Sequence, residues 1–266
     1  MGQQRPPTVL VVAGSDPGAG AGLQADLKTI TALGGYALTA VTAITVQDTR
    51  RVYQVYPLSP QQVVQQMRVS LADVPIDCIK LGMLATRAIV EAVAELLAEW
   101  PAIPVVADPV LAGTAGGTLL DAGGRQAFLA ALLPRIALLT PNLPEAQALT
   151  GSSVQSVGDM LRAARQLAGV QGRAVLVTGG HLVGASLTDL LWDGRAVRHY
   201  YSQRLPGTFH GTGCTLAAAI AVGVAQGKSH DEAVRVALRH LRRAMAESLP
   251  LGRGQQILNP FFHRFS

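Results

Sequence analysis

Short apolar runs alternate with helical patterns along almost the whole chain, and this alternation is the feature that most restricts the fold. Each run ends in a turn that carries Gly, Asp or Asn, and a segment with helical spacing follows. Such runs are typical of buried strands, and strands that alternate with helices form parallel sheets. The predicted strands are Val9–Ala13, Thr39–Val46, Asp77–Leu81, Ile103–Ala107, Ile136–Thr140 and Val175–Thr178. The sequence therefore predicts an α/β fold in three layers: a doubly wound, mostly parallel sheet with helices on both faces.

Helix boundaries are marked by capping residues. Ser59-Pro60 and Thr86 each precede a helical pattern, and Gly34-Gly35 follows the pattern over Leu23–Leu33. Ser and Thr are preferred N-caps, Pro suits the first turn and Gly ends helices. A further long helix is predicted over Asp231–Ser248, with its basic face interpreted as solvated surface.

The composition is that of a single packed domain. Hydrophobic residues make up 49% and charged residues 15% of the 266-residue chain, which excludes a disordered protein. No repeat, linker or break in composition divides it, so residues 1–266 are predicted to form one domain, with a flap around 47–57. The net charge is +5 and aromatic residues are 5%. This mild charge is not interleaved with aromatics, so we expect an anionic small-molecule ligand and no nucleic acid.

Neither a membrane nor a disulfide framework is expected. The apolar run at Val9–Ala13 is too short for a signal peptide, and the longest apolar stretch, Leu216–Ala225, is far below the ~18 residues of a membrane helix. The two cysteines have no zinc spacing. We therefore expect a soluble cytoplasmic protein.

A glycine-rich segment, His210-Gly211-Thr212-Gly213-Cys214-Thr215, runs directly into an alanine-rich helix and is the strongest local signal. Glycines allow the backbone to approach a ligand, and free amides at a helix start bind anions. Glycine also serves caps and close packing, which is the alternative explanation.

The cysteine of this segment lies in the first helical turn. There the helix dipole and amides should lower the thiol pKa, so that Cys214 could act as a general base. Most free cysteines are small buried hydrophobes, which is the interpretation given to Cys78 inside its strand.

A second glycine-rich loop, Gly14–Gly22, follows the first predicted strand. Its glycine spacing does not match the dinucleotide-binding fingerprint, and no acidic residue stands about twenty positions further on. The chain also lacks the Gly-Lys-Ser/Thr of a P-loop. This loop is therefore predicted to wrap a small ligand rather than a pyrophosphate.

The third signal is Thr140-Pro141-Asn142-Leu143-Pro144-Glu145, which opens a helix after a strand. Asn142 and Glu145 share one side of the first helical turn, where their oxygens could hold Mg²⁺. The same spacing is that of a capping box, and the two interpretations are compatible. Asp108, at the end of another strand, is a second candidate carboxylate on the same rim.

Together these segments resemble the ribokinase-like superfamily, and within it the hydroxymethylpyrimidine/phosphomethylpyrimidine kinases of thiamine biosynthesis. The matching segments occur in the family's order and cover roughly residues 8 to 226. They are Ala13–Asp26, Thr42–Thr49, Lys80–Leu84, Asp108-Pro109-Val110, Leu139–Ala146, Gly179-Gly180-His181 and His210–Thr215. The full set, with Cys where most sugar kinases of the superfamily carry Asp, is fairly specific.

The resemblance implies ATP-dependent phosphorylation of 4-amino-5-hydroxymethyl-2-methylpyrimidine and, in a second step, of its monophosphate. It implies Mg²⁺ as cofactor, and K⁺ as a further candidate ion. By position, Cys214 would be the base and the amides of Gly211, Thr212 and Gly213 would hold the transferring phosphoryl group. The substrate residues would be Gln47, reading the aminopyrimidine edge, with Gly14, Asp26 and Met83 around the ring. The nucleotide residues would be Asn142, Glu145, Thr178 and Gly180, and the metal residues Asp108 and Glu145.

Two departures remove cations that the family often places near phosphates. Thr178 stands where a Lys often precedes Gly-Gly-His, and the loop Gly113–Gly117 lacks the usual Lys. Arg50, Arg51, Arg204 or K⁺ are the candidate substitutes. Two alternatives remain open, a pyridoxal or pyridoxine kinase and a non-catalytic pyrimidine-binding module. We also expect a homodimer, with the aromatic C-terminal segment packed on the sheet or on a partner subunit.

Overall fold

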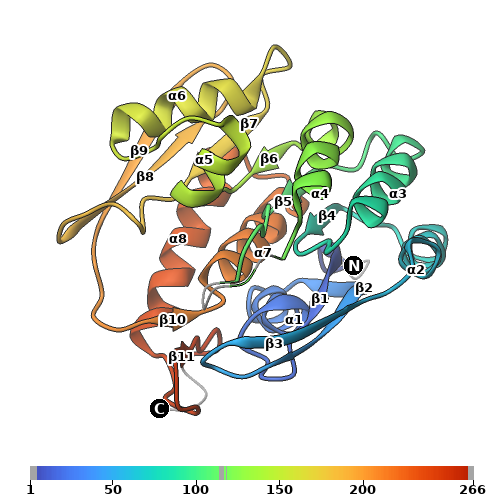
Figure 1. Ribbon diagram of the computed structural model, residues 1–266, viewed down its shortest axis with the longest axis horizontal. Coiled ribbons are helices and arrows are strands. Elements are labelled where there is room, and N and C mark those ends of the chain that lie inside the picture. The colour runs from blue at the N-terminus through green and yellow to red at the C-terminus, as the bar shows by residue number, and fades with distance from the viewer. Residues whose placement is uncertain (1–4, 114–116, 118, 263–266) are drawn as a thin grey trace.

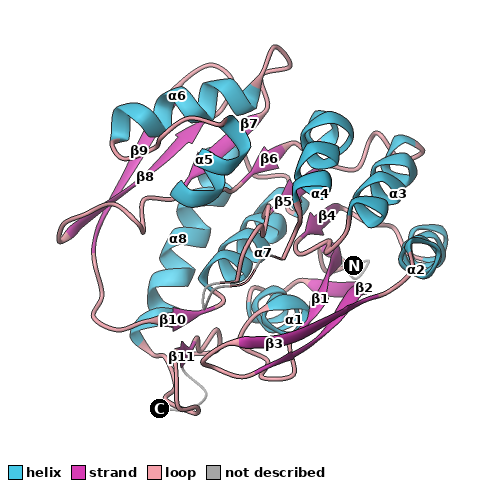
Figure 2. Cartoon of the chain, viewed as in Figure 1, coloured by secondary structure: helices cyan, strands magenta, loops and turns pink. Residues whose placement is uncertain are grey.

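A nine-stranded sheet forms the centre of the protein in the computed structural model, which describes residues 5–113, 117 and 119–262 (Figures 1 and 2). The strand order is β3-β2-β1-β4-β5-β6-β7-β8-β9. The strands are β1 (Thr8–Ser15), β2 (Tyr36–Gln47), β3 (Val52–Pro57), β4 (Cys78–Leu81), β5 (Val105–Ala107), β6 (Leu138–Leu139), β7 (Ala174–Val177), β8 (Ser186–Trp192) and β9 (Val197–Gln203). The six strands from β2 to β7 in this order pair in parallel, whereas β3, β8 and β9 are antiparallel to their neighbours. The mostly parallel sheet is thus confirmed.

Helices cover both faces of the sheet, and alternate residues of β1 pack into two hydrophobic cores on opposite faces. Val9 and Val11 pack in the core that contains α1 (Gly22–Ala32), α7 (Thr212–Ala225) and α8 (His230–Ala246). Leu10 and Val12 pack in the opposite core. Its helices are α2 (Pro60–Asp73), α3 (Arg87–Ala98), α4 (Ala122–Ala127), α5 (Leu143–Thr150) and α6 (Val157–Ala168), with a π-helix over Phe128–Leu132 and a 3₁₀ turn over Leu133–Arg135. Side chains that alternate along a strand point to opposite faces, which gives the three layers.

The predicted caps are present. Ser59 accepts a hydrogen bond from the Gln62 amide at the start of α2, and Thr86 accepts one from the Ile89 amide at the start of α3. Gly34 has a φ of +79°, in the left-handed region that suits the end of a helix. None of the described helices is long and apolar enough to cross a membrane.

Three hairpin or tail elements were not predicted. Within the segment interpreted as a flap, β3 pairs antiparallel with β2, so only its turn at 48–51 projects from the sheet. The strands β8 and β9 form a second hairpin at the other edge. The C-terminal strand β11 (Gln256–Ile257) pairs in parallel with β10 (Phe209–His210), directly before α7. The C-terminal segment therefore reaches the glycine-rich loop.

Candidate active site

The loops at the carboxyl ends of the parallel strands surround one cavity of about 720 Å³. Gly14 to Asp16 follow β1, Gly82 and Met83 follow β4, and Asp108 follows β5. Residues after β6 and β7 and the first turn of α7 complete the wall. The cavity thus lies where a doubly wound sheet is expected to bind ligands.

The glycine-rich segment forms a backbone cradle at the start of α7. Gly211 is the N-cap with a φ of +79°, and a Cβ there would overlap the Gly20 carbonyl oxygen. A Cβ at Gly213 would lie 3.1 Å from Asp108 Oδ2. The first amides of a helix have no partner within the helix, so Thr212 and Gly213 present donors to the cavity. This arrangement can hold an anion.

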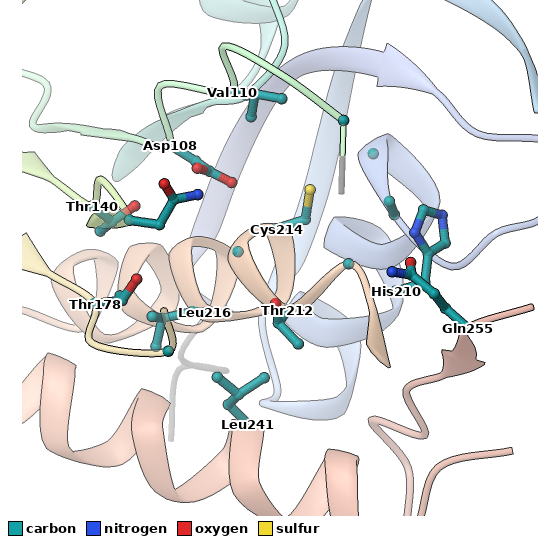
Figure 3. A pocket seen from close by; sticks show the side chains of 18 of the residues that line it. Asp108, Val110, Thr140, Thr178, His210, Thr212, Cys214, Leu216, Leu241 and Gln255 are labelled. Carbon is teal, nitrogen blue, oxygen red and sulfur yellow. The ribbon is translucent and has the colours of Figure 1, made fainter. Parts of the chain in front are cut away.

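The Cys214 thiol lies in this first turn and points into the cavity with Asp108 (Figure 3). Burial raises its pKa to about 12; the Lys80 charge lowers it, whereas Asp26 and Asp108 raise it. The prediction of a lowered thiol pKa was therefore wrong, because burial and two carboxylates outweigh the helix start. For Cys78, which is fully buried in β4 and whose pKa burial also raises, the interpretation as a small hydrophobe is confirmed.

A buried ion pair stands at the floor of the cavity, which Lys80 lines and Asp26 does not. Lys80 Nζ donates to Asp26 Oδ2 at 2.8 Å, and neither side chain is exposed. Asp26 was expected around the substrate ring, but α1 places its carboxylate below the cavity wall, where it neutralises Lys80. Lys80 itself was missed, although a lysine inside an apolar strand is a signal that a buried partner exists.

The loop after β1 is organised by Asp16, which sequence reasoning also missed. Its carboxylate accepts hydrogen bonds from the amides of Gly18, Gly20 and Ala21 at 2.8 to 3.0 Å. His210 Nε2 lies 3.0 Å from Asp16 Oδ2 and so joins this loop to the cradle. Burial alone would raise the pKa of Asp16, but the hydrogen bonds from His210 and the amides lower it. The carboxylate therefore stays charged and fixes the loop.

Three of the four predicted substrate residues line the same part of the cavity. Gln47 ends β2, and its side chain also hydrogen bonds to Asp16. Gly14 and Met83 pack together, since a Cβ at Gly14 would lie 2.8 Å from the Met83 methyl carbon. A flat ring placed here would find an amide at its edge and a thioether against its face.

Two carboxylates meet on the opposite wall. Asn142 Oδ1 accepts from the Glu145 amide and Glu145 Oε2 accepts from the Asn142 amide, both at 2.9 Å, so the capping box is confirmed. Burial, and then Asp108, raises the pKa of Glu145, while burial raises that of Asp108 against the pull of Lys80. Two buried carboxylates that repel each other suit a hard divalent cation such as Mg²⁺, which prefers oxygen ligands and would offset their negative charge. Among the described residues no cluster of three or more His, Cys, Asp or Glu forms a closed metal cage.

The remaining wall carries the predicted nucleotide residues and several arginines. Thr178 and Gly180 line the cavity after β7. The basic face of α8, interpreted as solvated surface, also forms part of the cavity wall through Arg235, Arg239 and Arg242. Positive charge is therefore present beside the predicted nucleotide residues. The spacing of these arginines on an amphipathic helix did not indicate that they would line a cavity.

The candidate substitutes for the missing lysines have different positions. Arg204 donates to the carbonyl oxygens of residues 180, 182 and 184, so it supports the loop after β7. Arg50 pairs with Asp48 at 3.4 Å. Arg51 lines the cavity, with its guanidinium 4.5 Å from the Tyr53 ring centroid. The loop Gly113–Gly117 lies partly outside the described residues.

Comparison with solved structures confirms the ribokinase-like fold. A pyridoxal kinase from Bacillus subtilis, solved as an ADP complex, superimposes with a TM-score of 0.90 at 32% identity and covers 98% of this chain and 100% of that one. A phosphomethylpyrimidine kinase from Clostridium difficile gives a TM-score of 0.80 at 33% identity, over 90% of this chain and 99% of the other.

Sequence comparison identifies the family. A hydroxymethylpyrimidine/phosphomethylpyrimidine kinase from Streptomyces coelicolor is 43% identical over 94% of this chain and 92% of its own length. A bifunctional thiamine biosynthesis protein from Geobacter sulfurreducens is 42% identical over 95% of this chain, which spans about half (52%) of that protein. The family profile described as phosphomethylpyrimidine kinase matches residues 16–259, and the chain therefore belongs to the phosphomethylpyrimidine kinase family.

Proposed function

We propose that this protein transfers the γ-phosphoryl group of ATP to the hydroxymethyl group of 4-amino-5-hydroxymethyl-2-methylpyrimidine, and then phosphorylates the resulting monophosphate. The observation that carries the proposal is that the Gln47 carboxamide, the backbone cradle at the start of α7 and the carboxylates of Asp108 and Glu145 line one cavity. The 43% identity to a kinase of this name supports the choice of substrate.

In the proposed complex the ring lies against Gly14 and Met83, and the Gln47 carboxamide pairs with its amino group and neighbouring ring nitrogen. A carboxamide has both a donor and an acceptor, as this edge requires. The ring is thereby held with its hydroxymethyl group toward the cradle. Lys80 lines the same cavity, and its charge, balanced by Asp26, lowers the pKa of both Cys214 and Asp108.

In the transfer step the substrate hydroxyl oxygen forms a bond to the γ-phosphorus, the bond to the β-phosphate oxygen breaks, and ADP leaves. The amides of Gly211, Thr212 and Gly213 hold the charge on the transferring group. Cys214 Sγ would receive the hydroxyl proton as a thiolate, a form that burial disfavours by raising the thiol pKa and that the Lys80 charge favours. Positioning and charge stabilisation dominate this chemistry, so the amide cradle is expected to contribute more than the strength of the base.

Asp108 and Glu145 are the residues that would hold Mg²⁺. When bound, this ion would neutralise the phosphate charge. Asn142, Thr178 and Gly180 would line the nucleotide, and the arginines of α8 add positive charge on that side. Arg51 is the cation of the flap turn that lines the cavity, and we assign it to the phosphate of the monophosphate substrate; K⁺ is a further candidate ion.

Pyridoxal is the second candidate substrate. Pyridoxal kinases superimpose on this chain with TM-scores of up to 0.90, among them one from Staphylococcus aureus solved with pyridoxal. Their identities of 32 to 33% are lower than the 43% to the Streptomyces coelicolor enzyme, which favours the pyrimidine. A non-catalytic pyrimidine-binding module is the third candidate.

ADP release with each alcohol separates these candidates. The purified chain with Mg²⁺ and ATP is expected to release ADP when the pyrimidine alcohol or its monophosphate is added. Turnover with pyridoxal alone would assign the protein to the second candidate. Calorimetric binding of the pyrimidine without ADP release would identify a binding module.

The chain is also proposed to act in the cytoplasm as a homodimer, without a nucleic-acid or membrane partner. Exposed apolar side chains gather on the β2–β3 hairpin, where Ile44 pairs with Tyr56 and where Val46 and Tyr53 are also exposed. Such a patch is typical of a protein interface. Sedimentation of the wild type and of an Ile44→Lys variant tests it, since the variant should be monomeric.

A further inference from the structure

The C-terminal segment Gly252–Ile257 is attached to the rim of the substrate cavity. The Gln255 amide donates to the Thr49 carbonyl oxygen at 2.9 Å, and the Gly254 amide donates to Thr49 Oγ1 at 3.0 Å. A Cβ at Gly252 or Gly254 would overlap Thr49, so the two segments are in close contact. On its other side the segment pairs with β10 through Ile257 and His210. It therefore connects the flap turn to the cradle.

The side chain of Gln255 lines the cavity, near His210 (Figure 3). Its carboxamide oxygen is buried, and no residue that the structure describes donates a hydrogen bond to it. Buried polar atoms nearly always have a partner, so such an atom at the wall of a binding cavity indicates that a ligand supplies one. The missing partner must be a donor, because a carbonyl oxygen only accepts.

We propose that Gln255 Oε1 accepts a hydrogen bond from the exocyclic amino group of the pyrimidine and so determines specificity for an amine next to the hydroxymethyl group. This inference rests on the proposed function. An amino group carries two N–H donors, and the Gln47 carboxamide engages one of them. Gln47 precedes Thr49 by two residues, and the Thr49 carbonyl oxygen accepts a hydrogen bond from the Gln255 amide. The carboxamides of Gln47 and Gln255 therefore lie on neighbouring segments of one rim.

The same acceptor disfavours pyridoxal. In pyridoxal the ring carbon next to the hydroxymethyl-bearing carbon carries an aldehyde, whose oxygen is an acceptor. A site built to receive an N–H rejects an analogue without one, because its own acceptor stays unpaired. Gln255 thus explains how a fold shared with pyridoxal kinases can prefer the pyrimidine.

Calorimetric titration of Gln255→Met with the pyrimidine alcohol and with pyridoxal tests the proposal. Met keeps the length of the side chain but removes the acceptor. The dissociation constant for the pyrimidine is expected to rise about 2- to 12-fold, the range for one neutral hydrogen bond, while that for pyridoxal stays unchanged or falls. Gln256→Met is the matched control, because Gln256 Oε1 accepts from Ser248 Oγ and the residue does not line the cavity.

A second variant, Gln255→Glu, retains an acceptor and is expected to keep the preference for the pyrimidine. Equal weakening of both ligands in Gln255→Met, or no weakening of the pyrimidine, would overturn the inference. If the wild type binds the pyrimidine without releasing ADP, the kinase function fails but the affinities still decide the role of Gln255. If the wild type does not bind the pyrimidine, both proposals fail.

Discussion

Replacing Lys80 by Met tests whether the buried ion pair at the floor of the cavity is a structural necessity. Lys80 Nζ and Asp26 Oδ2 are 2.8 Å apart, and both side chains have 0% exposure. The substitution leaves the Asp26 charge buried without its partner, which typically costs about 3–5 kcal/mol of unfolding free energy. At about 2–4 °C per kcal/mol for a chain of this size, the melting temperature should fall by about 6–20 °C.

This loss should depend on pH, and its sign follows from Asp26. Burial already raises the pKa of Asp26 against the lowering effect of Lys80, and the variant removes that lowering effect. The folded variant therefore binds a proton more tightly than the unfolded chain does. Its stability should rise as the pH falls through the raised pKa, so the loss at pH 5 should be smaller than at pH 8.

Urea unfolding at both pH values measures the effect, with two controls. Arg68 and Glu99 form an ion pair of nearly the same length, 2.7 Å, but are 54% and 49% exposed, so Arg68→Met should leave the urea midpoint almost unchanged. The double variant Asp26→Leu/Lys80→Met removes both charges and should recover most of the stability. A loss below about 1 kcal/mol in Lys80→Met, or a double variant less stable than the single one, would refute the reasoning.

Three further predictions concern the cradle and the carboxylates. Cys214→Ser should lower kcat in ADP release while the melting temperature stays unchanged; unchanged turnover would make the thiol a packing group. Gly211→Ala should cost about 1–3 kcal/mol in urea unfolding and impair turnover, because alanine is strained at a φ of +79° and its Cβ would overlap the Gly20 carbonyl oxygen; a neutral effect would contradict this close approach. The raised pKa of Glu145 makes wild-type stability fall as the pH rises above its ordinary value of 4.5, and Glu145→Gln should make this slope shallower in thermal melts, with the remainder due to Asp108, whose pKa burial also raises. An unchanged slope would exclude Glu145 as its source.

The layers of the fold could be predicted because their signals are local. A short apolar run indicates a strand wherever it occurs, and Ser59, Thr86 and Asn142 mark helix starts by hydrogen bonds within three residues. The rule that ligands bind at strand ends then placed Gly14 and Asp108 on one rim without any coordinates. The β8–β9 hairpin also had a local signal, Asp193-Gly194 between alternating residues, which was overlooked.

The electrostatics of the site could not be predicted, because they depend on residues that only the fold brings together. The sequence around Cys214, at the start of a helix, is typical of an activated thiol. Its pKa is nevertheless governed by burial and by Lys80, Asp26 and Asp108 from three other parts of the chain. Gln255 lies in the C-terminal segment and reaches the cavity only because the segment bonds to Thr49. Contacts between residues far apart in the chain leave no local pattern in the sequence, so they could not be predicted from it.

In the proposed function, the residues of phosphoryl transfer and those that recognise the ring lie on different elements, and this bears on how far fold similarity can indicate a substrate. The cradle, Cys214 and the carboxylates stand on strand ends and a helix start, where backbone geometry fixes them. Gln47 ends β2 and Gln255 lies in the C-terminal segment, so neither side chain is part of the cradle itself. Close superposition on a pyridoxal kinase therefore reflects the shared phosphoryl-transfer frame, and the substrate follows from which hydrogen-bonding groups the rim presents.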